Sequence, residues 1–108
     1  WYVHDNITID AIKVIHMGDD SASTDTLQYS LNSFTLDSSG AGSGDLSAGA
    51  VVASSSSQTI DNADADVHSM TVGSPDVTAG KVLLMCVRGG ATINNDITAS
   101  VYIKYHIT

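Results

Sequence analysis

The sequence predicts an all-β protein: a single β-sandwich of jelly-roll or Greek-key type, with about seven or eight antiparallel strands and essentially no helix. Short apolar segments alternate residue by residue, and connections rich in Gly, Ser, Asp and Asn separate them. All 12 acidic residues are aspartates, which favour turns and loops, and glutamate does not occur. No stretch combines a helical period with capping residues. The chain, residues 1–108, is expected to form one domain.

The first strand is expected to contain a β-bulge. Its inward residues change phase halfway along; they are Ile7 and Ile9, then Ile12, Val14 and His16. One extra residue near Asp10–Ala11 would bring both halves onto one face. A similar phase change in residues 25–36 predicts a second bulge or bend at Asn32–Ser33.

The later strands follow from two contrasting patterns. Residues 81–88, KVLLMCVR, are almost continuously apolar, which predicts a strand buried on both faces. Residues 97–108 alternate without a break, which predicts a long final strand with one buried face. Between the strands, residues 37–49 and 89–96 are expected to be loops that form the variable outward surface.

The net charge argues against two classes of partner, and the single cysteine excludes a disulfide within the chain. The 12 acidic residues against 4 Lys and Arg give a formal net charge of −8, which disfavours nucleic acid and anionic membrane surfaces as partners. Cys86 has no second cysteine to pair with, so no disulfide within the chain is possible. Its apolar neighbours predict a small buried hydrophobe rather than a nucleophile.

The motifs of common enzymes are not present. The sequence contains neither the GxSxG turn of serine hydrolases nor a phosphate-binding glycine loop followed by a helix. The interpretation is therefore a protein that is not an enzyme, with no catalytic residues and no cofactor.

Two groups of residues are weighed as metal ligands. The segment DNADAD resembles the start of a calcium loop, but the glycine and glutamate that complete such a loop do not follow it. A surface turn is the favoured interpretation, with a weak calcium site at Asp61, Asp64 and Asp66 as the alternative. The four histidines are not at zinc-like spacing, and only a cluster between strands or subunits could unite them; they are His4, His16, His68 and His106.

Aromatic residues provide the candidates for surface contacts. Trp1 and Tyr2 open the first strand region, and Tyr102 lies on the polar face of the last strand together with His106. Large rings bury much area at little entropic cost, so these four residues are the predicted assembly or surface contacts. The alternative is that they are ordinary half-buried residues of strands.

Several stretches together resemble small β-sandwich domains of tailed-phage virion proteins, such as head fibres, capsid decoration proteins and tail-fibre tips. They are the opening WYVHDNITIDAIKVI, a serine- and threonine-rich middle, the phrase VTAGKVLLMCVRGG and the long alternating C-terminal strand. The resemblance implies a non-enzymatic structural protein located in a virion. It also implies a homo-oligomer, with a trimer favoured, which contacts other virion proteins and acts in particle assembly and host-surface attachment. A stalk or anchor is expected upstream of Trp1, so residues 1–108 would be the ordered part of a longer or processed chain.

A competing interpretation is a carbohydrate-binding or adhesive module of a secreted or surface bacterial protein. Such a module would stack sugars on Trp1 or Tyr102 and bind calcium at DNADAD. A third interpretation is a structural spacer without any ligand.

Overall fold

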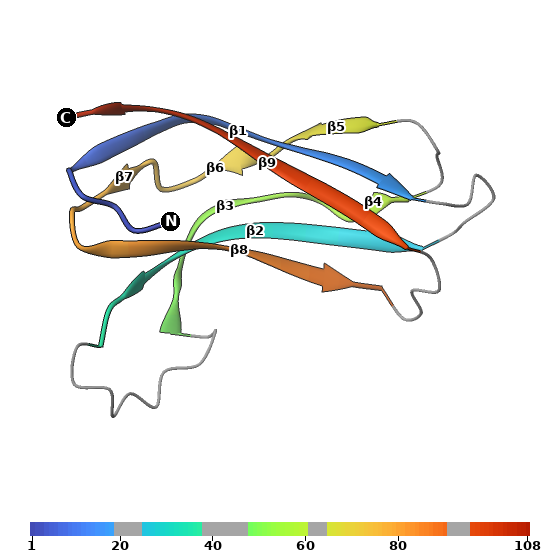
Figure 1. The fold of residues 1–108 in the computed structure, drawn as a ribbon, viewed down its shortest axis with the longest axis horizontal. Helices are drawn as coiled ribbons and strands as arrows, with labels where there is room; N and C mark the ends of the chain where they lie inside the picture. The colour runs from blue at the N-terminus through green and yellow to red at the C-terminus, as the bar shows by residue number, and fades with distance from the viewer. Residues whose placement is uncertain (19–24, 38–47, 61–64, 91–95) are drawn as a thin grey trace.

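The computed structural model describes residues 1–18, 25–37, 48–60, 65–90 and 96–108. These residues form two antiparallel sheets that face each other, which confirms the predicted all-β sandwich (Figure 1). They contain no α-helix, and accordingly none of their elements is an apolar helix long enough to cross a membrane. Most of the two predicted outward loops, residues 38–47 and 91–95, lies outside the described residues.

The first sheet is built around β1 (Ile7–Gly18). The last strand, β9 (Ile97–Ile107), pairs with β1 along its whole length. Two shorter strands, β5 (Asp66–Ser69) and β7 (Asp76–Val77), pair with separate stretches of β1 on its opposite edge.

The second sheet is built around β2 (Thr26–Thr35). One edge of β2 pairs with β8 (Lys81–Gly89), and the other edge pairs with β3 (Ala50–Ser54) and β4 (Gln58–Thr59). A two-residue strand, β6 (Thr71–Val72), extends the sheet beyond β3.

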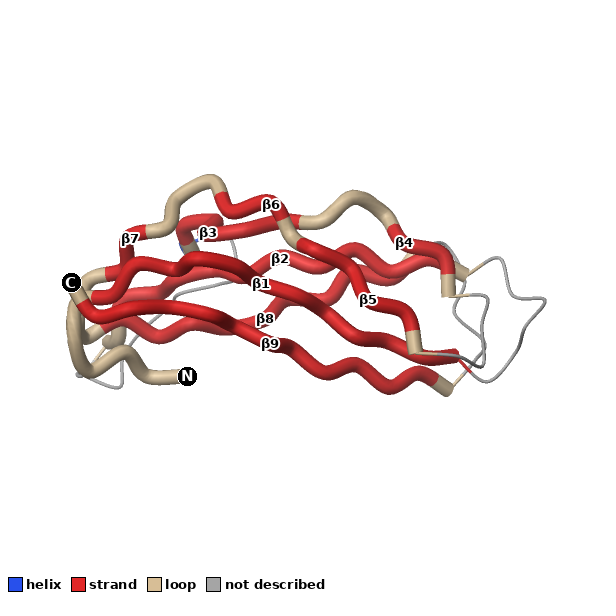
Figure 2. Tube along the Cα trace, turned by 90° about the horizontal axis from the view of Figure 1, so that it is seen from above, coloured by secondary structure: helices blue, strands red, loops and turns tan. Residues whose placement is uncertain are grey.

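The two flanks of the sandwich differ. On one flank the chain passes from β5 in the first sheet to β6 in the second through a single residue, Met70, whose amide donates to the Ile12 carbonyl at 3.0 Å. On the other flank lie β8 and β9, one from each sheet, and in the described part of the chain these two strands do not pair with each other (Figure 2). We call this flank, formed by β8 and β9, the open side.

The start of the chain covers one end of the open side. Residues 1–3 run antiparallel to the beginning of β8: the Trp1 and Leu83 backbones exchange hydrogen bonds of 2.9 and 2.8 Å, and the Val3 amide donates to the Lys81 carbonyl at 2.9 Å. Val3 is fully buried and joins the core. The rest of β8, from Leu84 to Gly89, has a strand partner only on its β2 side among the described residues.

The core confirms the bulge predicted in the first strand. The register between β1 and β9 shifts between Ile9 and Ala11, so Asp10 is the extra residue. As a result, all five predicted inward residues of this strand are buried; they are Ile7, Ile9, Ile12, Val14 and His16.

The second predicted irregularity is displaced onto a neighbouring strand. Leu31 pairs with Ala53 and Asn32 pairs with Val51, so the extra residue is Val52 of β3. The irregularity thus falls at Leu31–Asn32, next to the predicted bulge or bend, but the pairing of β2 with β8 is continuous there, so placing an extra residue on β2 itself is wrong.

The burial predicted for the last two long strands is partly wrong, because both are edge strands on the open side. In β8, Leu83 is buried, but Leu84 and Val87 are exposed, and Cys86 is only half-buried. In β9, Ile97 and Ile103 pack partly against the core, whereas the rest of the predicted buried face is exposed. A strand that lacks a neighbour on one edge leaves its side chains uncovered from that direction.

Candidate functional site

The open side displays apolar side chains that point into the sandwich without being covered. Val101 pairs with Val14 and Tyr105 pairs with Ile9, and directly opposite residues in a sheet point to the same face. Their partners on β1 are buried, yet Val101 is 40% and Tyr105 is 46% exposed. The inward face of β9 is therefore open to solvent along the flank.

β8 adds to this apolar surface from the second sheet. Val87 pairs with the buried Tyr29, so it also faces inward, and it is 53% exposed. At the end covered by residues 1–3, the Trp1 and Tyr105 rings lie 4.9 Å apart between their centroids. These two rings also line a small hollow of about 140 Å³, together with His4 and Asp5.

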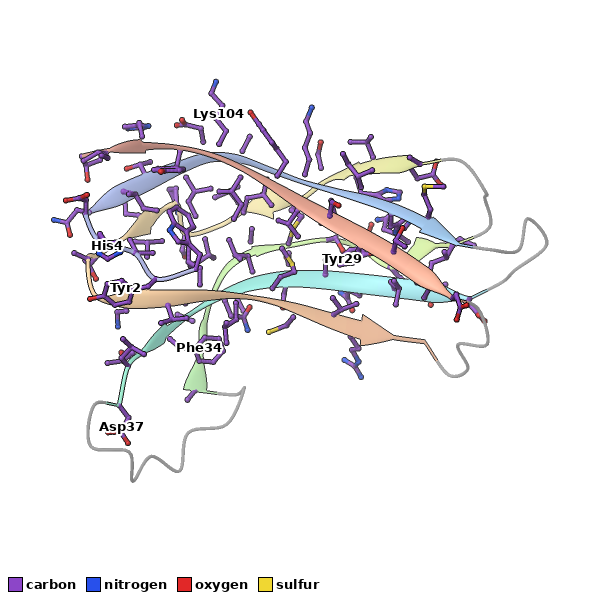
Figure 3. The ribbon with its side chains drawn as sticks, viewed as in Figure 1. Tyr2, His4, Tyr29, Phe34, Asp37 and Lys104 are labelled. Carbon is purple, nitrogen blue, oxygen red and sulfur yellow. The ribbon has the colours of Figure 1, made fainter. Side chains whose placement is uncertain are left out.

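The open side is also the part of the fold that carries most of the basic residues. β8 and β9 contain none of the 12 aspartates, but they carry Lys81, Arg88 and Lys104, three of the four Lys and Arg residues. Figure 3 shows Lys104 directed away from the sandwich. The negative charge of the chain is thus concentrated on the other parts of the molecule.

The four residues predicted as surface contacts do not form one patch. Trp1 packs on Tyr105, and Tyr2 makes an edge-to-face contact with His4 at 4.7 Å. Tyr102 pairs with Lys13 and is exposed on the outer face of the first sheet. Tyr102 and His106 share the outer face of β9, whereas Trp1 packs on the inward-facing Tyr105 and Tyr2 lies in the segment paired with β8.

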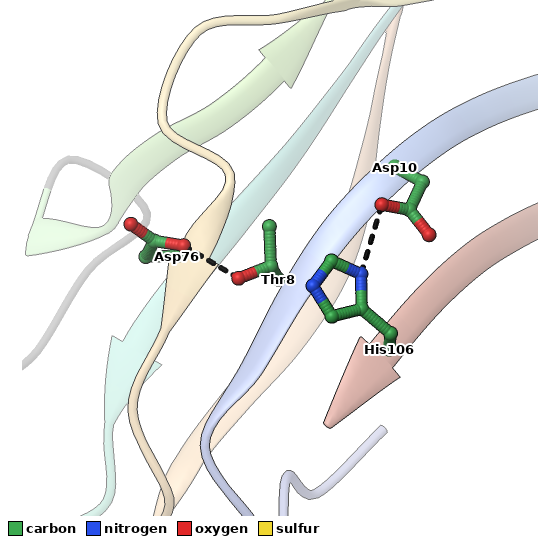
Figure 4. A network of polar contacts seen from close by, with 4 residues as sticks. All are labelled: Thr8, Asp10, Asp76 and His106. Atoms are coloured by element: carbon green, nitrogen blue, oxygen red, sulfur yellow. Dashed lines mark hydrogen bonds and ion pairs between the residues drawn. The ribbon is translucent and has the colours of Figure 1, made fainter. Parts of the chain in front are cut away.

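His106 takes part in a polar cluster on the first sheet. Its Nδ1 lies 3.0 Å from the Asp10 carboxylate, beside the hydrogen bond that the Thr8 hydroxyl donates to Asp76 at 2.7 Å (Figure 4). Because the His106 and Asp10 side chains are 58% and 34% exposed, solvent screens this pair and limits it to about 1 kcal/mol at most.

A second group of functional side chains meets where β1 and β5 pair. His16 lies opposite Asp66, and His68 is two residues farther along β5 on the same face. The His16 Nε2 and His68 Nε2 atoms are 3.0 Å apart. One ligand atom from each of the three residues lies within 4.8 Å of the others. Two imidazoles and a carboxylate therefore converge on one point.

The second sheet holds His16 in this position. His16 Nδ1 lies 2.7 Å from the Tyr29 hydroxyl, which reaches across the sandwich from β2. Both side chains are buried, and burial raises the pKa of Tyr29, so the phenol stays protonated at neutral pH. This contact fixes the orientation of the His16 ring.

The calcium alternative is only partly within the described residues. Asp61 and Asp64 lie outside them, and Asp66 lies beside His16 and His68. The proximity of the two histidines could not be seen from their spacing, because only the register of β1 against β5 brings residues so distant in sequence together. For the open side a signal existed: apart from Asp96, the chain contains no acid after Asp76.

Comparisons of the chain with protein-family models, with curated proteins and with solved structures find no match.

Proposed function

We propose that this chain is a non-enzymatic structural protein of a phage virion, a fibre, decoration or tail-tip domain that assembles with copies of itself through the open side. The resemblance of its sequence supports the virion location. The open side supports self-association: two neighbouring edge strands expose inward-facing apolar residues such as Val87, Val101 and Tyr105. Edge strands of this kind pair readily with another chain.

The charge distribution favours a second copy of the chain as the occupant of the open side. Copies that each carry a net charge of −8 repel one another wherever their aspartates come close. β8 and β9 carry no aspartate and three of the four Lys and Arg residues, so a second copy that approaches this flank meets less repulsion than at the aspartate-bearing strands β1, β5 and β7. The apolar rows would then be buried between subunits, and a closed ring of three copies is the arrangement we favour.

The experiment that tests self-association is the solution mass of residues 1–108 by light scattering, with and without EDTA. We expect a multiple of 11.2 kDa, three-fold for the favoured trimer. Val87→Glu, which places an acid on the open side, should give the mass of a single chain. The matched control is Val51→Glu on β3, where the valine is equally exposed at 53%, and its mass should equal that of the unmodified chain.

A single-chain mass at all concentrations would overturn the self-association proposal, as would equal effects of Val87→Glu and Val51→Glu. If that single chain also bound a glycan, and Trp1→Ala removed the binding, the carbohydrate-binding alternative would replace it. The hollow between Trp1 and Tyr105, which also contains Asp5, is the observation that favours this alternative. The virion location has its own test: peptides of the chain should be found by mass spectrometry in purified phage particles.

A further inference from the structure

We propose that His16, His68 and Asp66 form a binding site for one divalent transition-metal ion, of which Zn²⁺ is the best fit. The proposal is independent of the virion function, since it uses residues of β1 and β5 away from the open side.

The distances are close to those that a metal site requires. A tetrahedral zinc ion with Zn–N bonds of about 2.0–2.1 Å holds two nitrogen ligands about 3.3 Å apart. The Nε2 atoms of His16 and His68 are 3.0 Å apart, so a small rotation of the two rings would admit the ion between them. Asp66 stands opposite His16 in the register and offers a carboxylate oxygen as the third ligand.

The ligand set selects the class of metal. Imidazole nitrogens suit zinc and its neighbours among the transition metals, whereas calcium takes six or more oxygen ligands. One carboxylate and two imidazoles therefore fit Zn²⁺ rather than Ca²⁺. Three protein ligands leave a fourth position for water, as in zinc sites that are not fully enclosed by protein.

The surroundings also have the features of a metal site. Histidines that bind metals commonly use their second ring nitrogen in a hydrogen bond that fixes the ring, and Tyr29 provides that contact to His16 Nδ1 at 2.7 Å. His16 is buried, while Asp66 and His68 are only half-buried, so an ion can reach the site from the β5 side.

A bound ion would connect three strands in two sheets. It would join β1 to β5 through His16, Asp66 and His68, and the hydrogen bond from His16 to Tyr29 would extend the connection to β2. Because an ion that binds only the folded chain stabilises that state, zinc should raise the thermal unfolding midpoint of the protein.

The test is a zinc titration of the full chain after removal of metals with EDTA. Equilibrium dialysis with elemental analysis should give one Zn²⁺ per chain, and the midpoint of thermal unfolding should rise with zinc. His68→Gln and Asp66→Asn should each weaken zinc binding, the former by more than about tenfold, and should abolish the rise in midpoint. Because both side chains are only half-buried, we expect both variants to fold without metal. Circular dichroism in EDTA verifies this.

His106→Gln is the control, because His106 and Asp10 form the other histidine–carboxylate pair of the described residues. This variant should bind zinc as tightly as the unmodified chain. The proposal is overturned if the chain binds no zinc, since the two histidines are then only hydrogen-bonded to each other. It is equally overturned if His106→Gln loses the ion while His68→Gln keeps it.

Discussion

At the scale of single residues, one glycine has a backbone conformation that other residues rarely adopt. Gly80 has a φ of +85° in the turn before β8, and its amide donates to the Val3 carbonyl at 2.8 Å. Side chains with a Cβ atom meet the backbone in this left-handed region, whereas glycine does not. Gly80 thus lets the chain reverse while residues 1–3 stay paired with β8.

We therefore expect Gly80→Ala to lower the free energy of unfolding by about 1–2 kcal/mol. Gly73→Ala is the matched control: Gly73 has no positive φ, and an added Cβ would meet no atom within 4 Å. That variant should stay within about 0.5 kcal/mol of the unmodified chain. Urea denaturation followed by circular dichroism measures both values, and equal losses in the two variants would show that backbone conformation is not the cause.

At the scale of elements, the bulge at Asp10 keeps both halves of β1 on the core. Deleting Asp10 would turn Ile7 and Ile9 to the opposite face from Ile12. Exposing two buried isoleucines costs about 1.5–3 kcal/mol each, which is a large part of the stability of a small domain. We expect the deletion to leave the chain unfolded or strongly destabilised in a thermal melt.

Asp10→Ala is the control for this deletion, because it keeps the length of the strand and removes only the exposed contact with His106. It should lower the free energy of unfolding by at most about 1 kcal/mol. A deletion variant as stable as Asp10→Ala would mean that the strand can shift its register without loss.

The same elements show what the sequence could predict. A change of phase in β1 is visible because its apolar residues are separated by polar ones, and it correctly located the bulge. The apolar run of β8 carries no such information: it suits a buried central strand equally well, and only the pairing reveals an edge strand. The meeting of His16 with His68 depends on the register of β1 and β5, which periodicity alone does not determine.

At the scale of the whole molecule, the contrast between a net charge of −8 and the basic strands β8 and β9 makes self-association depend on salt. Long-range repulsion between copies of net charge −8 opposes assembly, while contact at the open side is mainly apolar. Raising the ionic strength from about 0.01 M to about 0.15 M shortens the Debye length from about 30 to about 8 Å and screens that repulsion. We expect the dissociation constant of the oligomer to fall over this range.

Sedimentation equilibrium at the two ionic strengths measures this change. The opposite trend, a weaker oligomer at higher salt, would mean that attraction between Arg88 or Lys104 of one copy and aspartates of the next holds the assembly together. In that case the contact would be an ionic one, and our account of the flank would be wrong.

The difference between the two flanks also has a mechanical consequence. The chain crosses between the sheets at Met70 on one flank, whereas β8 and β9 on the other are not paired with each other (Figure 2). The short crossing from β5 to β6 therefore joins the two sheets on one flank, while on the open side Trp1 bridges β8 and β9 at one end. We expect the two sheets to separate most readily along the part of the open side that residues 1–3 do not cover, with the hydrogen bonds within each sheet kept intact. A neighbouring subunit bound across the open side would contact β8 and β9, and so both sheets, at once. Assembly would then also set the rigidity of each subunit.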